Sequence, residues 1–214
     1  MHYRVQQTKS AIRADYDVME DGEVLYSATI PFNVKGYKAL FSRSGQLVYT
    51  IERDVIVSLR RLSSSGEKVI DYYSIKDCMG NTSGAIYRKR TKGFFGYYFF
   101  ELDLDGKEYK IYEIGLGKQG IKLPVYIGEQ QIALIEKGTH TANDLDSYDL
   151  SAVDAKTAQI SSLFCVYYDF MRFGNHGEVS VNSKQVTYVY TGNKKLKGKY
   201  NPDWHCLCSA LLRR

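Results

Sequence analysis

The sequence predicts a mostly β protein, a closed antiparallel β-barrel of about twelve strands around a central hydrophobic α-helix. Two features of the chain indicate this fold. Between residues 20 and 130 a turn-type glycine recurs about every twenty residues, and after these turns comes a single strongly apolar segment, residues 160–171. Regular turns are typical of barrels and sandwiches, and one buried helix favours a barrel closed around it. The glycines are Gly22, Gly45, Gly66, Gly84, Gly106 and Gly128.

The segments beside these glycines alternate apolar and polar residues, as strands with one buried face do. After the first glycine, for example, Val24, Tyr26 and Ala28 occupy alternate positions. The Asp-Gly pair at 105–106 is a strong signal for a type I′ hairpin. Six turns imply about twelve strands, which we expect at about residues 13–140.

The apolar segment belongs to a predicted helix over residues 152–173. Ser151 and Asp154 resemble a capping box, and Gly174 lies just past the predicted end. At about 100° per residue the apolar side chains leave one gap of about 100°, which holds Ser162 and Asp169. A helix on the outside of a sheet has a wider polar face, so we expect this one to be enclosed; a dimer-interface helix is the alternative. The expected core residues are Ile160, Leu163, Phe164, Val166, Tyr167, Phe170 and Met171.

We expect residues 1–214 to form one domain, because this length is within the range of a single all-β domain. Residues 174–214 form an extension after the helix, in which residues 178–190 resemble another hairpin. Pro31 and Pro124 cannot donate a ladder hydrogen bond and are expected at strand starts or edges.

Composition and charge leave the partners open. A formal net charge of +5 permits weak attraction to anionic surfaces, although it could serve solubility alone. The start lacks the apolar core of a signal peptide, and no stretch approaches the roughly 20 apolar residues of a membrane span. We therefore expect a cytoplasmic protein that contacts membranes at most peripherally. Four cysteines are few for this length and are expected as reduced thiols.

The best candidate contact surface is a basic hairpin followed by an aromatic run. Its expected ligand-binding residues are Arg88, Lys89, Arg90, Lys92, Tyr97 and Phe99. If Tyr98, Phe100 and the leucines after them face inward, Tyr97 and Phe99 point outward beside the cations. Exposed aromatics next to cations suit a membrane interface, an acidic partner or, less well here, single-stranded nucleic acid. The alternative is a charged edge that protects against aggregation.

Other basic and polar clusters have simpler explanations. Lys194, Lys195, Lys197 and Lys199 are expected in a solvated loop. The acidic run at 143–149 is expected in a loop before the helix, where negative charge is favourable.

No motif supports a catalytic residue, a metal site or a cofactor. The glycines of residues 115–120 match a dinucleotide fingerprint, but a predicted strand follows where a helix is required. The calcium-loop match that begins at Glu101 fails at Tyr112, where a bidentate glutamate is needed. Cys206 and Cys208 lack the further ligands of a closed zinc site. Asp169 lies inside the apolar helix and is the one residue whose burial could serve a chemical role. The alternative is a structural role, in which its carboxylate is hydrogen-bonded to a neighbouring tyrosine or backbone donor.

The pattern resembles the tubby C-terminal-domain-like superfamily, which includes the LURP-one-related proteins and the phospholipid scramblases. The similarity lies in the Asp-Gly turns at 21–22 and 105–106 and the helix segment 162–171, and it covers about residues 16–173. The resemblance implies a twelve-strand barrel around a helix, and tubby domains bind phosphoinositide head groups through basic side chains. None of their lipid-binding residues can be transferred by position, and the cysteine-rich segment and terminal membrane helix of scramblases are missing here.

These observations favour a non-catalytic binding or scaffold module over an enzyme. The first hypothesis is association with an anionic ligand or lipid head group through the basic hairpin at 88–92. The second is a protein–protein interaction module that uses the aromatic strand or the extension. The third is a hydrolase whose site is assembled only in three dimensions.

Overall fold

The computed structural model describes residues 1–10, 13–31, 37–53, 68–139, 145–173 and 188–204. Thirteen strands form one antiparallel sheet in the order β10, β11, β12, β13, then β1 through β9. Strand β11 also pairs with β9, so twelve strands close into a barrel and β10 lies beside β11 outside the ring. The predicted fold class is confirmed. The strands are β1 His2–Lys9, β2 Ala14–Glu20, β3 Glu23–Ile30, β4 Lys38–Arg43, β5 Gln46–Glu52, β6 Lys68–Asp77, β7 Thr82–Arg90, β8 Tyr98–Leu104, β9 Lys107–Ile111, β10 Ile114–Gly115, β11 Ile121–Ile127, β12 Gln130–Lys137 and β13 Ser147–Ala152.

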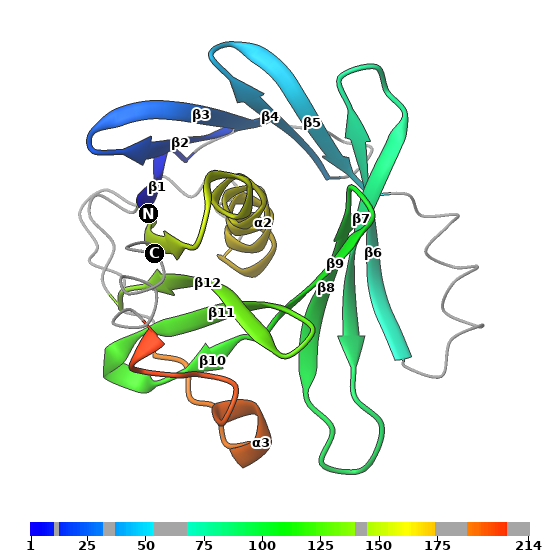
Figure 1. Cartoon of the computed structure of the whole chain (residues 1–214), viewed down its shortest axis with the longest axis vertical. Coiled ribbons are helices and arrows are strands. Elements are labelled where there is room, and N and C mark those ends of the chain that lie inside the picture. Colours follow the sequence, from blue (N-terminus) through cyan, green and yellow to red (C-terminus); the bar gives the residue numbers. More distant parts are fainter. Residues whose placement is uncertain (11–12, 32–36, 54–67, 140–144, 174–187, 205–214) are drawn as a thin grey trace.

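Helix α2, Ala155–Phe173, lies inside the barrel (Figure 1). Its end is as predicted, but it begins three residues later than expected, because residues up to Ala152 belong to β13. Asp154 caps the helix through a hydrogen bond from the Thr157 amide at 2.6 Å, whereas Ser151 is part of the strand.

Most of the predicted helix core is buried. Ile160, Leu163, Phe164, Val166 and Tyr167 are at most 2% exposed. Ser162 and Asp169, on the predicted polar gap, are equally buried, so the barrel encloses this part of the helix all round.

The last turn of α2 is less enclosed than predicted. Phe170 is partly buried and packs against the core. Met171 is 40% exposed, so its prediction as a core residue is wrong. The helix emerges from the barrel interior at this end, and the residues of its last turn contact solvent.

Three of the predicted glycines lie in tight turns, and the predicted type I′ turn at 105–106 is one of them. The pairs at 21–22, 44–45 and 105–106 have positive φ at both central residues, as type I′ turns require. Gly84, however, is not a turn residue; it lies within β7, and the turn before it uses Gly80 with φ of 85°. A Cβ on Gly84 would lie 2.0 Å from the carbonyl oxygen of Asp103, so close approach of β8 requires the glycine. Gly66 lies outside the described residues.

The two prolines occupy different places from those expected. Pro31 directly follows β3, and Pro124 lies inside β11. On one side of β11 the partner changes from β10, opposite Ile121 and Lys122, to β9, opposite Val125. Pro124 falls in the break between these partners, where a missing N–H disrupts no ladder bond.

The barrel uses more of the chain than the predicted range of about 13–140. Strands β1 and β13 lie outside that range and pair with each other, and β1 also pairs with β2. Tyr148 and Leu150 of β13 face the core, while Asp149 between them is half exposed in its side chain. The prediction of a loop over residues 143–149 is therefore wrong for residues 147–149, which belong to β13. The carboxylate of Asp149 made this part of the strand resemble an acidic loop in the sequence.

The described part of the extension, residues 188–204, lies against the outside of the barrel (Figure 1). Tyr190 forms a bridge with Leu116, and α3, Lys194–Lys197, follows. Leu196 and Trp204 are buried against outward-facing residues of the barrel. Residues 178–187 of the predicted hairpin lie outside the described residues.

Candidate functional site

The two arginines of the basic hairpin lie on one face of the β7–β8 ribbon. Arg88 pairs with Phe100 and Arg90 with Tyr98 in the antiparallel register. Both guanidinium groups lie over the ring of Tyr98, at 5.0 Å and 5.6 Å from its centroid. The cation–π contacts hold the arginines beside an aromatic ring that is itself 46% exposed.

Lys89 lies on the opposite face and has a structural partner. It forms an ion pair with Glu101, and the two side chains are only 15% and 8% exposed. Burial raises the pKa of Glu101, and the ammonium of Lys89 opposes this rise. Lys89 therefore compensates a buried carboxylate, which makes it less suited to contact a ligand than its neighbours.

The predicted exposure of the aromatic pair is wrong. Phe99 faces outward from the barrel but is only 4% exposed, because α3 covers it with Leu196. Tyr97 is partly buried in the same cluster. Tyr98, expected inside, is exposed at the start of β8, whereas Phe100 and the leucines after it are buried as predicted.

The loop between β7 and β8 presents two phenylalanines to solvent. Phe94 is 91% and Phe95 85% exposed, and their ring centroids lie 5.2 Å apart. The sequence did not lead us to single out these two residues. The glycines on either side, Gly93 and Gly96, are the signal that could have found the loop.

The extension adds lysines to this end of the barrel. The Asn193 side-chain amide donates a hydrogen bond of 2.9 Å to the carbonyl oxygen of Phe95. A groove of about 490 Å³ lies between the two segments. Exposed Lys92, Lys194 and Lys195 line it together with the two phenylalanines, so the fold joins two basic clusters that are separate in the sequence. Within the described part of the chain, no carboxylate forms an ion pair with these three lysines.

A second group of charged residues is buried inside the barrel. The carboxylate of Asp169 accepts hydrogen bonds from the hydroxyls of Tyr16, at 2.8 Å, and Tyr148. Lys137 forms an ion pair with Asp146 and lies 3.9 Å from Asp169. Burial, with the nearby charge of Asp146, raises the pKa of Asp169 to about 7, against the effect of Lys137 and the tyrosines. The tyrosine partners favour the structural interpretation of Asp169.

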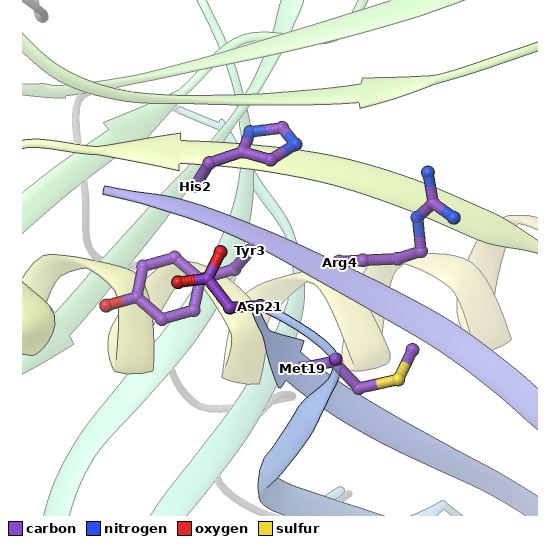
Figure 2. A pocket seen from close by; sticks show the side chains of 6 residues that line it. His2, Tyr3, Arg4, Met19 and Asp21 are labelled. Atoms are coloured by element: carbon purple, nitrogen blue, oxygen red, sulfur yellow. The ribbon is translucent and has the colours of Figure 1, made fainter.

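A shallow hollow of about 270 Å³ lies beside the start of β1. Figure 2 shows His2, Arg4 and Asp21 at its rim; their polar ends do not converge on one point. His2 and Arg4 instead lie near Asp149, at 4.0 Å and 3.4 Å. This arrangement offers no nucleophile beside a base.

The acidic residues of β8 and β9 approach one another on the barrel surface. Carboxylate oxygens of Glu101, Asp103 and Glu108 lie within 4.8 Å of one another. Lys89 and Lys110 form ion pairs with the two glutamates, so ammonium groups already supply positive charge there.

We predict that EDTA leaves the melting temperature unchanged, because lysines rather than a metal ion balance the carboxylates at 101–108. The measurement is thermal unfolding followed by circular dichroism, with and without chelator. A large drop in melting temperature that calcium or zinc restores would contradict this prediction.

No family model, curated protein or solved structure matches the chain. No described helix is both long and apolar enough to span a bilayer. His140, His176, His205, Cys206 and Cys208 lie outside the described residues. Among the described residues, the groove at the β7–β8 loop combines exposed cations with exposed aromatic rings and is the candidate functional site.

Proposed function

We propose that this protein is a non-catalytic binding module that associates peripherally with anionic lipid surfaces through its cationic end. The cationic end consists of Lys92, Lys194 and Lys195, which line the groove. Arg88 and Arg90 lie on the face of the ribbon that carries Phe100 and Tyr98, opposite the face that α3 covers. The observation behind the proposal is that exposed lysines from two distant segments line one groove. A cytoplasmic location, peripheral to the membrane, belongs to the same proposal.

The electrostatics of the cationic end suit weak and reversible binding. Each Lys or Arg near an anionic membrane contributes about 1 kcal/mol, so three lysines supply about 3 kcal/mol. This contribution falls with salt, because the Debye length shortens from about 10 Å at 0.1 M to about 3 Å at 1 M. Lys89 does not belong to the cationic end, because its ammonium forms an ion pair with Glu101.

We also propose that the chain is a distant member of the tubby C-terminal-domain-like superfamily. A closed barrel around a hydrophobic helix supports this assignment. The assignment transfers no lipid-binding residue to this chain, so the cationic end is argued from its own geometry.

The test compares two triple variants on vesicles. Lys92→Ser, Lys194→Ser and Lys195→Ser together remove the lysines of the groove; Arg43→Ser, Lys107→Ser and Lys156→Ser remove three exposed cations at the opposite end of the barrel. Each triple variant lowers the formal net charge from +5 to +2, so a general charge effect is the same in both.

At low salt we expect the groove variant to partition on the order of 100-fold more weakly than wild type into phosphatidylserine-containing vesicles. The control variant should bind much more tightly than the groove variant, and pure phosphatidylcholine vesicles should bind none of the three proteins well. Cosedimentation over a salt series measures this. Equal binding by the two variants would contradict the proposal and leave the protein-interaction module as the better hypothesis.

A further inference from the structure

We infer that membrane association is completed by insertion of the β7–β8 loop, with Phe94 and Phe95 entering the bilayer interface. This inference rests on the proposed function and goes beyond it. It adds an apolar contribution to an electrostatic one, and it fixes the orientation of the barrel with this loop toward the membrane.

The two phenylalanines of the β7–β8 loop are exposed to water. They are the most exposed large hydrophobic side chains of the described residues, at 91% and 85%. Their rings contact each other, at 5.2 Å between centroids, in an edge-on arrangement. Two adjacent, water-exposed rings at a loop tip contribute little to the core and gain most from transfer into an apolar phase.

The loop is held in shape by hydrogen bonds of its backbone. The Thr91 amide donates to Tyr97 O at 3.0 Å, and the Tyr97 amide donates to the Thr91 hydroxyl at 2.9 Å. Gly96 donates to Gly93 O at 3.1 Å, and Gly93 has a φ of 100°. A preorganised loop loses little conformational entropy on binding. None of these bonds uses the Phe94 or Phe95 side chain, so substitution at the tip leaves the closure of the loop intact.

The lysines of the cationic end lie beside the two phenylalanines. Lys92, Lys194 and Lys195 line the same groove as both phenylalanines, and the bond from Asn193 to Phe95 O links the two segments. Flexible lysine side chains can reach head-group phosphates while neighbouring aromatic rings lie deeper. This combination of apolar tip and cationic rim is complementary to an anionic bilayer.

The experiment places a tryptophan at the tip. Phe94→Trp reports on the loop, and Met79→Trp is the matched control, 81% exposed in the turn at the other end of β7. The native Trp204 is buried and supplies a constant background that is measured in wild type. The vesicles contain phosphatidylcholine with phosphatidylserine, and a second set has bromine atoms on the acyl chains.

We expect the Phe94→Trp emission to shift to the blue and to be quenched by brominated chains, while Met79→Trp behaves as it does without vesicles. A Phe94→Trp protein that cosediments with vesicles but shows neither change would overturn insertion and leave the proposed function standing. Cosedimentation of neither protein would overturn both.

A second measurement tests the apolar contribution directly. Phe94→Ser with Phe95→Ser should weaken vesicle partitioning roughly tenfold or more, because the apolar area no longer leaves water. Met79→Ser is the control and should bind as wild type. Equal partitioning of the two variants would overturn the inference.

Discussion

Replacing Phe164 by alanine is expected to lower the free energy of unfolding by about 3–5 kcal/mol. Phe164 is 1% exposed in the middle of α2. Its ring packs against Phe100 of β8, at 5.2 Å between centroids, and against Tyr167 and Tyr168 of its own helix. These neighbours are packed inside a closed barrel and cannot all collapse into the space left by the ring, so a cavity remains.

Urea unfolding followed by circular dichroism measures this loss. Met171→Ala on the same helix is the control, since Met171 is 40% exposed, and we expect it to cost about 1 kcal/mol or less. A Phe164→Ala protein as stable as the Met171→Ala protein would contradict the enclosure of α2 and would favour a helix on the outside of the molecule.

The predictable parts of this fold depend on local sequence. The Asp21–Gly22 and Asp105–Gly106 turns require positive φ at two successive residues, and few residue pairs other than Asn-Gly and Asp-Gly provide it. The burial of α2 could likewise be predicted from one segment, because apolar side chains lie on nearly all sides of this helix. Gly84 was assigned to a turn, although it is required for close approach of a neighbouring strand. The sequence alone does not distinguish these two roles of a glycine.

The parts that could not be predicted depend on residues far apart in the chain. Phe99 was expected to be exposed, and it is covered by Leu196, about a hundred residues later. Lys92 and Lys194 line one groove for the same reason, because the extension folds back onto the barrel. Strand periodicity fixes the side of the sheet to which a residue points, but it does not show what packs on that side.

The stability of the protein is expected to fall as the pH rises from about 5 to about 7, because Asp169 is buried inside the barrel. The native pKa of Asp169 is about 7, against an ordinary value of 3.8, since burial and the nearby Asp146 disfavour its ionised form. Between these two values the native state holds a proton that the unfolded state has released. The contribution of Asp169 is therefore fully present below the ordinary pKa and is lost as the pH rises through the native pKa.

Asp169→Asn should remove this part of the pH dependence, because an amide does not ionise and can still accept a hydrogen bond from Tyr16 or Tyr148. Relative to wild type, the variant should gain about 3 kcal/mol of unfolding free energy between about pH 5 and about pH 8. Asp149→Asn is the control. It makes the same substitution of an amide for a carboxylate, but at a half-exposed side chain on the outer face of β13. Urea unfolding at several pH values gives the profiles. Parallel profiles for wild type and Asp169→Asn would show that Asp169 remains ionised in the folded protein, with Lys137, 3.9 Å away, compensating its charge.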